Sequence, residues 1–287
     1  MRKCFYLSAF FVFILAALSG CGIFRSHCAL CKDPLVFVHI SDPQFGMYQA
    51  FKEVQGYERE ITDGRNAANM ITPLKPEFLV ITGDLVEQWN NDEQLRLFEA
   101  FRKELESIAP VYVTAGNHDM PPTADGLAIF RRRYGPDRFT ADHKGCRLIF
   151  LNSNLIAFAD KLPDEAAEQR KWLQAALKQA AADRVERIFV FQHHPFFLTE
   201  PDEKDEYFNI PQSRRKGYMD LLADHGVTAV FTGHLHRESI REYRGMKMIS
   251  TSSLGKPLGE APPGIRVVIA SKDDLVHEFM PTGIRKP

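Results

Sequence analysis

The most constraining feature of this sequence is an alternation between apolar runs of strand length and amphipathic segments of helical length. The apolar runs predict strands at 35–40, 77–82, 110–114, 147–152, 187–192 and 227–232. The segments between them predict helices at 57–72, 91–107, 124–134, 165–182 and 212–225. This alternation indicates an α/β fold rather than separate helical and sheet domains.

The C-terminal part of the chain has a different pattern. Four short runs, HRESIREYR, MKMISTSS, IRVVIAS and DLVHEFM, predict strands without helices between them. We expect them to form a second sheet or an antiparallel extension. The charged stretch EPDEKDEYFN, residues 200–209, is predicted to be a mobile loop at the rim of a site.

The N-terminus carries the features of an export signal. MRKC supplies two cations, and the apolar stretch FYLSAFFVFILAAL that follows is shorter than a membrane span and suits a signal peptide. LSGC, residues 18–21, resembles a bacterial lipobox, in which the chain is cut before Cys21 and this residue carries the lipids. An uncleaved anchor helix, or ordinary cleavage near Gly20, also fits these residues.

These features divide the chain into a signal peptide of the lipoprotein type at 1–20, a tether at 21–33 and one domain at 34–287. We expect an extracytoplasmic lipoprotein whose lipid anchor holds it to a membrane, at the periplasmic face or the cell surface. Cys28 and Cys31 lie in the tether, where a local disulfide and two free thiols both fit the sequence. Cys146 begins an apolar run and is predicted to be a core residue.

The overall charge of the chain is nearly balanced. Lys and Arg number 36, Asp and Glu number 37, and the formal net charge is −1. Without a basic field or a basic stripe, we expect no nucleic-acid partner. The sequence does not determine the oligomeric state.

Five predicted strands are followed by polar residues of similar kinds. Carboxyl ends of strands meet at one edge of an open α/β sheet, where ligands bind, and glycines at 83, 116 and 233 permit sharp turns there. The polar residues that follow the strands are Asp42, Gln44, Asp84, Asn117, His118, Asp119, His193, His194, His234 and His236. His39, inside the first strand, is predicted to be a hydrogen-bonded core residue.

These side chains offer oxygen and nitrogen donors without a thiolate. Such donors suit hard or borderline divalent ions such as Zn, Mn or Fe, and their number favours two ions over one. Each element alone is a common strand-to-loop turn. The order and the combination of the five elements carry the specificity.

The segments SDPQFG, TGD, TAGNHD, FQHHP and GHLH resemble the motifs of the calcineurin-like metallophosphoesterases, namely D-x-H, G-D, G-N-H-[DE], H and G-H-x-H. The resemblance covers nearly all of residues 34–280, and one branch of that family also has D-P-Q in place of D-x-H. It implies a four-layer α/β/β/α sandwich with two mixed central sheets. It also implies two divalent metal ions, of Mn, Fe, Zn or Mg, and a phosphate-ester substrate.

Carried over by position, the resemblance assigns roles to individual residues. Asp84 would bridge both metals, and His193 rather than His194 would be a ligand because the family has His-x-Pro. His118 would stabilise or protonate the leaving group, with Glu87 orienting it. The ligands are expected to be Asp42, Gln44 and His236 at the first metal, and Asn117, His193 and His234 at the second.

Two positions depart from the pattern of related phosphatases. Gln44 is neutral and a poorer donor than imidazole, so the first metal should be held more weakly and favour Mn or Mg. Gln88 stands where the protein Ser/Thr phosphatases have Arg, which removes one contact to phosphate.

The predicted activity is hydrolysis of phosphate monoesters, including those of phosphoproteins, by a metal-bridging hydroxide. A phosphodiesterase acting on nucleotides or phospholipid head groups is the alternative within enzymes. A non-catalytic surface binding lipoprotein is the alternative of another class. Three side chains are predicted to contact the substrate: Asn152, Asn209 and Arg214.

Overall fold

The computed structural model of the protein describes residues 34–283. Within these residues no helix is both long enough and apolar enough to cross a bilayer. Cys21, Cys28 and Cys31, with the predicted signal and tether, lie outside the described residues. The predictions about lipidation and about a disulfide therefore stay predictions.

The first sheet combines the beginning and the end of the described chain. Its strands are β1 (Leu35–Ile40), β2 (Phe78–Thr82), β3 (Val111–Thr114), β10 (Gly264–Ala270) and β11 (Leu275–Pro281), in the order β11-β10-β1-β2-β3. β1, β2 and β3 run parallel, whereas β10 is antiparallel to both β1 and β11. The sheet is therefore mixed, and its parallel strands end at the same edge.

The second sheet is formed by the middle of the chain. Its strands are β4 (Phe139–His143), β5 (Cys146–Phe150), β6 (Arg187–Phe191), β7 (Ala229–Thr232), β8 (Ser239–Tyr243) and β9 (Met246–Ser250), in the order β4-β5-β6-β7-β9-β8. The four inner strands are parallel, and the edge strands β4 and β8 are antiparallel to their neighbours.

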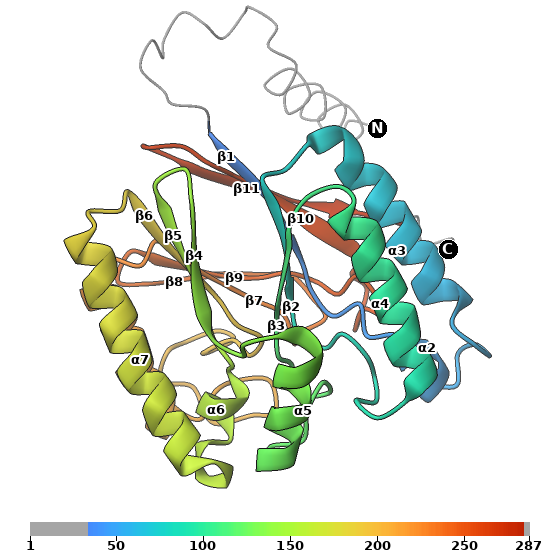
Figure 1. Ribbon diagram of the computed structural model, residues 1–287, viewed down its shortest axis with the longest axis horizontal. Helices are drawn as coiled ribbons and strands as arrows, with labels where there is room; N and C mark the ends of the chain where they lie inside the picture. Colours follow the sequence, from blue (N-terminus) through green and yellow to red (C-terminus); the bar gives the residue numbers. More distant parts are fainter. Residues whose placement is uncertain (1–33, 284–287) are drawn as a thin grey trace, which may run out of the picture.

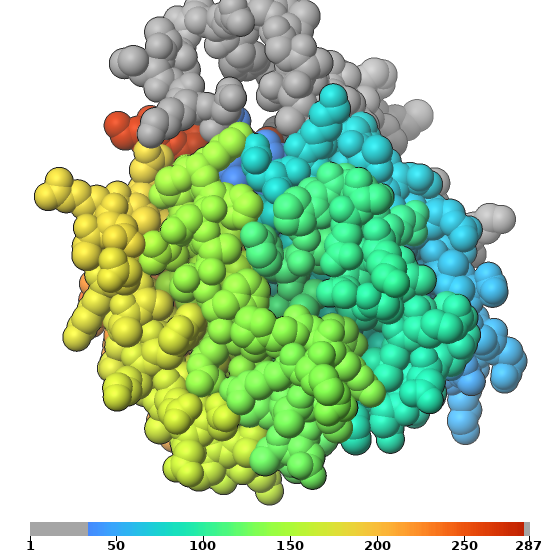
Figure 2. Space-filling model, in the orientation of Figure 1, coloured from blue at the N-terminus to red at the C-terminus, as the bar shows by residue number. Residues whose placement is uncertain are grey.

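Helices cover the outer face of each sheet. In Figure 1, α3 and α4 lie on one side of the molecule and α7 lies on the other. The long helices are α3 (Glu58–Ile71), α4 (Asp92–Glu106), α5 (Ala124–Tyr134), α7 (Pro163–Ala182) and α8 (Gln212–Asp224). The short ones are α2 (Met47–Ala50), α6 (Asn154–Ala157), η1 (Thr72–Leu74) and η2 (Ala159–Lys161). In the space-filling view the side chains of α4, α5 and α7 cover most of one face of the molecule (Figure 2).

Three apolar layers hold this arrangement together. Residues of α3 and α4, such as Phe98, pack on the first sheet, and residues of α7 and α8, such as Leu173, pack on the second. Between the sheets lies a layer of aromatic rings in which Phe191 stacks on Phe231 and Phe37 meets both edge-on. The predicted four-layer α/β/β/α sandwich with two mixed sheets is confirmed.

The strands of the C-terminal part divide between the two sheets. β8 and β9 extend the second sheet, whereas β10 and β11 return to pair with β1 in the first. The sequence predicted strands here but left their partners open, because strand pairing between distant segments leaves no local pattern. Cys146, 4% exposed at the start of β5, is a core residue as predicted.

Candidate metal centre

The seven predicted metal ligands lie together beyond the carboxyl ends of parallel strands from both sheets. Asp42 and Gln44 follow β1, and Asp84 follows β2. The remaining ligands follow β3, β6 and β7; they are Asn117, His193, His234 and His236. A mixed pair of sheets that face each other brings the two sets of strand ends to one site.

The backbone at this site is strained. Five of the predicted ligands have a positive φ: Asp42 (47°), Gln44 (34°), Asp84 (48°), His234 (66°) and His236 (50°). This left-handed conformation costs a residue other than glycine about 1–2 kcal/mol. Such strain concentrates at functional sites, where the surrounding structure holds it.

Two glycines let the loops approach one another. A Cβ on Gly116 would lie 2.2 Å from Oδ1 of Asp84, and a Cβ on Gly233 would lie 2.4 Å from Oδ2 of Asp42. Asp119 fastens the same loops, because its carboxylate accepts the backbone N–H of Leu85 and of Gly116, each at 2.8 Å. The glycines in the G-N-H-D and G-H-x-H segments are thus required by packing.

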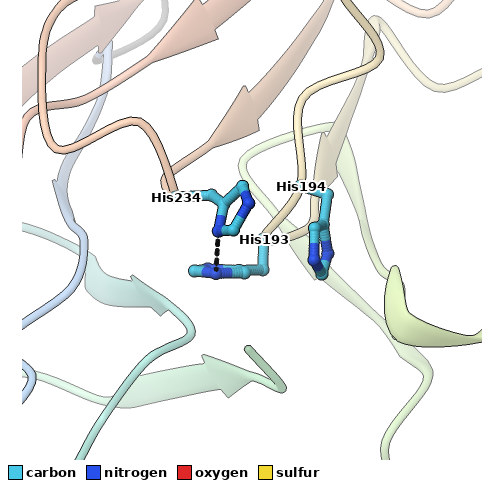
Figure 3. A group of neighbouring side chains, drawn as sticks. All are labelled: His193, His194 and His234. Carbon is cyan, nitrogen blue, oxygen red and sulfur yellow. Dashed lines mark hydrogen bonds between the residues drawn. The ribbon is translucent and has the colours of Figure 1, made fainter. Parts of the chain in front are cut away.

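His193 is the residue whose contacts fit a bound cation best. Its Nδ1 lies 2.7 Å from the carbonyl oxygen of Thr82 and must donate to it. Its Nε2 then faces Oδ1 of Asn117 at 3.1 Å, Oδ2 of Asp84 at 3.2 Å and Nδ1 of His234 at 3.1 Å (Figure 3 shows the last contact). Neighbouring lone pairs at such distances require a proton or a metal ion between them.

The other two predicted histidine ligands are oriented in the same way. Nε2 of His234 lies 3.1 Å from the carbonyl oxygen of Tyr207, and Nδ1 of His236 lies 2.6 Å from that of Lys256. Each ring donates to a carbonyl and keeps the lone pair of its other nitrogen for the site. Metal-binding histidines are generally held by such hydrogen bonds.

Charge in the site is balanced between buried carboxylates and imidazoles. Burial opposes ionisation of Asp84, but His193 outweighs it and holds the pKa of this carboxyl well below its usual range. Burial also lowers the pKa of His193, but Asp84 dominates and raises it to about 9. Ligand atoms of Asp42, Asp84 and His193 all lie within 4.8 Å of one another, so this group could hold a metal ion.

A second group of three residues that could hold a metal consists of His193, His194 and His234 (Figure 3). The ring of His194 lies 4.5 Å from that of His234, but its Nδ1 contacts the hydroxyl of Ser153 at 2.8 Å. Ser153 also accepts the backbone N–H of His194 at 2.9 Å. These hydrogen bonds to Ser153 hold the ring of His194 beside the site.

The side-chain amide of Gln44 is fixed through its nitrogen. Its Nε2 donates to Oε2 of Glu87 at 2.7 Å, which fixes the amide. Its Oε1 is buried and has no hydrogen-bond partner among residues 34–283. A buried carbonyl oxygen without a partner is costly unless a cation or water occupies the space beside it. The residues present thus fit the divalent metals that the sequence implies.

His118 lies at the edge of the site, where it could meet a leaving group. Its Nδ1 is 2.8 Å from the carbonyl oxygen of Glu87 and 3.5 Å from the carboxylate of the same residue. The backbone N–H of His118 donates to Oδ1 of Asp84 at 2.9 Å. Glu87 therefore orients His118 mainly through its main chain, while its carboxylate bonds Gln44, which refines the predicted role.

The three side chains predicted to contact the substrate do not line the cleft over the site, and their role stays a prediction. Asn152 is fully buried, and its side chain bonds Asp137 and Asn154. Asn209 bonds Glu203 within the loop at 200–209. Arg214 bonds the carbonyl oxygen of Ala157 and the carboxylate of Asp160. Each of these side chains makes hydrogen bonds to the fold around it.

The cleft over the site has a volume of about 300 Å³. Its polar side is formed by Gln44, Asp84, Glu87, His118, His234 and His236. Its apolar lining is formed by Met47, Phe51, Tyr207, Phe208 and Leu258, none of which was named individually from the sequence. Tyr207 and Phe208 belong to the charged loop at 200–209, which was predicted to form a rim. That loop was the feature of the sequence that could have identified them.

Comparisons with known proteins agree with this geometry. The family model described as calcineurin-like phosphoesterase matches residues 35–238. A relative from Bos taurus, serine/threonine-protein phosphatase CPPED1, is 34% identical over 263 residues, covering 86% of this chain and 84% of the relative. A probable cyclic nucleotide phosphodiesterase from Psychrobacter sp. is 24% identical over 188 residues, covering 62% of this chain and 52% of that protein.

The fold also matches a solved structure. The crystal structure of a dimetal phosphatase from Danio rerio aligns with a TM-score of 0.62 at 15% identity, covering 85% of this chain and 99% of that one. At this identity the likeness concerns the fold. The family match and the CPPED1 relative go further: the chain belongs to the calcineurin-like phosphoesterase family, whose members are metal-dependent phosphoesterases.

Proposed function

We propose that this protein is a dinuclear-metal phosphatase that hydrolyses phosphate monoesters. The observation that carries the proposal is the arrangement of three histidines, each of which donates one ring N–H to a backbone carbonyl and turns its other nitrogen to the site. With Asp42, Asp84, Asn117 and Gln44, these nitrogens provide enough donors for two ions. The family and the CPPED1 relative support the same activity.

The residues of the chain can divide the work of hydrolysis. When bound, two divalent ions would supply positive charge for the phosphoryl oxygens and lower the pKa of a water molecule. Nδ1 of His118 donates to the Glu87 carbonyl, so its Nε2 can donate a proton to the leaving oxygen when the ring is charged. Burial disfavours that charge, but Asp84 and the Glu87 carbonyl outweigh it and raise the pKa of His118.

The shape of the cleft favours a substrate with one phosphate group and an apolar neighbour. No Lys or Arg is among the described residues that line the cleft, and the Lys256 ammonium lies beside it, 4.8 Å from the ring of Phe51. The apolar side chains of the cleft would contact the alcohol part of the ester. A phosphorylated side chain on a protein fits this description, in keeping with the name of the Bos taurus relative.

A phosphodiesterase is the second candidate, since the relative from Psychrobacter sp. is a probable cyclic nucleotide phosphodiesterase. Turnover of p-nitrophenyl phosphate and of bis-p-nitrophenyl phosphate separates the two, measured with Mn, Zn, Fe or Mg. Monoesterase activity predicts the faster reaction with the first substrate. Faster hydrolysis of the diester would contradict it.

Metal analysis tests the alternative that the protein is a non-catalytic binding protein. We expect about two ions per purified chain after loading with Mn or Zn. Less than one ion per chain, with no hydrolysis of either ester, would contradict the enzymatic proposal and favour a binding lipoprotein.

We also propose that the protein acts outside the cytosol, held to a membrane by lipids on Cys21. The support is the N-terminal sequence alone. In cells, Cys21→Ser should release the protein from the membrane fraction and abolish incorporation of labelled palmitate. Unchanged fractionation and labelling would contradict the lipid anchor.

A further inference from the structure

His39 lies next to the carboxyl end of β1 and is fully buried between the two sheets. Its Nε2 is 2.8 Å from the hydroxyl of Thr82 at the end of β2. Its Nδ1 is 2.9 Å from the hydroxyl of Thr251, which follows β9 in the other sheet. The predicted core histidine is therefore hydrogen-bonded on both sides, and its two partners belong to different sheets.

Both hydroxyl partners of His39 continue into further hydrogen bonds. The Thr82 hydroxyl donates to Oγ of Ser41 at 3.0 Å, and Ser41 donates to Oδ2 of Asp42. On the other side, Nε of Arg266 donates to the Thr251 hydroxyl at 2.9 Å. The result is one continuous chain of buried groups from a guanidinium on β10 to a predicted metal ligand.

The carboxylate end of this chain determines the direction of its hydrogen bonds as far as His39. The carboxylate of Asp42 can only accept, so the Ser41 hydroxyl donates to it and must accept from Thr82. The Thr82 hydroxyl has then used its proton and must accept from Nε2 of His39. Arg266 can only donate, so the Thr251 hydroxyl accepts from it and, when the His39 ring is neutral, donates its own proton to Nδ1 of His39.

This assignment requires His39 to be neutral, with its proton on Nε2. Burial, with Arg266 as a second cause, holds the pKa of His39 well below its usual value. Arg266 lies opposite His39 in the antiparallel pairing of β1 and β10, and the carboxylate of Glu238 compensates its charge. A chain of hydrogen bonds that all point the same way strengthens each member by polarisation.

The chain ends on a particular oxygen of Asp42. Oδ2 accepts from Ser41 and from the backbone N–H of His234 at 3.0 Å, whereas Oδ1 lies 3.3 Å from the same N–H and 3.3 Å from Nε2 of His236. A Cβ on Gly233 would lie 1.6 Å from Oγ of Ser41, so glycine there makes room for the last link. Oδ1, whose two contacts are the longer ones, is consequently the oxygen more available to a metal.

We propose that His39 is a positioning residue: as the middle link of this hydrogen-bond chain, it orients the Asp42 carboxylate so that Oδ1 faces the metal site. The inference rests on the proposed dinuclear function. It assigns a task to a residue that does not line the cleft and to the hydroxyl of Thr82, whose side chain touches no predicted ligand directly.

The first test compares Mn²⁺ binding by calorimetry in matched variants. Thr82→Val removes the hydroxyl at nearly constant volume and should weaken the first metal about 10-fold, whereas Thr82→Ser keeps the chain and should retain the affinity of the wild type. Thr114→Val is the control, because Thr114 pairs with Thr82 across β2 and β3, is buried, and has a hydroxyl without a partner among residues 34–283. Equal affinity in Thr82→Val and Thr114→Val would overturn the proposal.

The second test is independent of metal. In the metal-free protein, ¹⁵N NMR of the histidine rings should show His39 as the Nε2–H tautomer from about pH 6 to pH 9. An Nδ1–H tautomer or a charged ring would overturn the assignment. If the wild type binds no metal, the proposed function fails, while this spectrum still decides the direction of the hydrogen bonds. If the wild type binds metal and Thr82→Val binds it with the same affinity, only the inference about His39 fails.

Discussion

Nε2 of His193 lies 3.2 Å from Oδ2 of Asp84, and both side chains are buried. The imidazole ring reaches the carboxylate across the space between the two sheets, from the end of β6 to the end of β2. This contact joins the halves of the candidate metal centre. The next residue in the chain, His194, is equally buried but is bonded to Ser153 through its Nδ1.

The first prediction separates these two adjacent histidines. Asp84→Ala and His193→Ala should lower kcat/KM for p-nitrophenyl phosphate by about 100-fold or more, because each removes a ligand. His194→Ala should retain activity within about 10-fold, since it removes only a group of the wall. The metal content of each variant provides the second measurement, and equal losses in the two His variants would contradict the assignment.

The second prediction concerns the weak ligand. Gln44→His should tighten the first metal site about 10-fold, because imidazole is a better donor than a neutral amide oxygen. Gln44→Leu, of similar size, should weaken it because the buried Oε1 is lost. Competition with a coloured chelator measures both. Unchanged affinity in both variants would show that Oε1 of Gln44 binds no metal.

The third prediction uses two adjacent arginines at the base of the loop at 200–209. Arg215 is fully buried and donates to the carbonyl oxygens of Pro201, Glu203 and Ile210. Arg215→Met should lower the free energy of unfolding by about 3 kcal/mol, because these carbonyls lose a charged donor. It should also increase hydrogen exchange of the loop, which supplies the Tyr207 carbonyl to His234.

Arg214→Met is the matched control for this change. Arg214 bonds Ala157 and the exposed Asp160, so its loss should cost about 1 kcal/mol and leave the KM for phosphate esters unchanged. A large rise in KM in Arg214→Met alone would support Arg214 as a substrate contact.

The fourth prediction distinguishes the ring of Tyr207 from its hydroxyl. The side chain is 67% exposed at the cleft, and its hydroxyl accepts from Nδ2 of Asn117 at 3.3 Å. Tyr207→Ala should raise KM for an aryl phosphate about 5-fold with little change in kcat, because it removes contact with the alcohol part. Tyr207→Phe keeps the ring and should leave KM unchanged; a similar rise of KM in both variants would place the effect on the hydroxyl.

The fifth prediction concerns pH and a carboxyl away from the metal ligands. Burial raises the pKa of Asp63 on α3 to about 7. A raised pKa in the folded state means that Asp63 favours folding at low pH and that this contribution is lost as the pH rises from about 4 to about 7. Asp63→Asn removes the titration, so its stability relative to wild type should increase over this interval by up to about 4 kcal/mol. Parallel stability curves for the two proteins, measured by urea unfolding, would contradict the prediction.

Much of the candidate site was predictable because its residues are local to strand ends. Asp84 follows the apolar run of β2 and His234 that of β7, so a pattern of a few residues placed each at a carboxyl end. Parallel strands then bring those ends together whatever the rest of the chain does. For the same reason the boundaries of α7 and β1 were close to those observed.

Contacts between distant segments left no such pattern. Asn152 follows a strand as Asp84 does, yet its side chain turns inward to Asp137. The Tyr207 carbonyl that orients His234 is a main-chain atom, which the residue type does not reveal.

The sequence by itself determined the two kinds of element, the donor set and the strand ends that carry it, because periodicity and residue chemistry are properties of short segments. Tertiary structure decided the partners of β10 and β11 and the ring nitrogen that each predicted histidine ligand turns to the site. It also decided the series of hydrogen bonds that joins Arg266 to Asp42. These depend on which groups meet when the two sheets pack together. A hydrogen bond is defined by its partner, and here the partner is usually dozens of residues away in the chain.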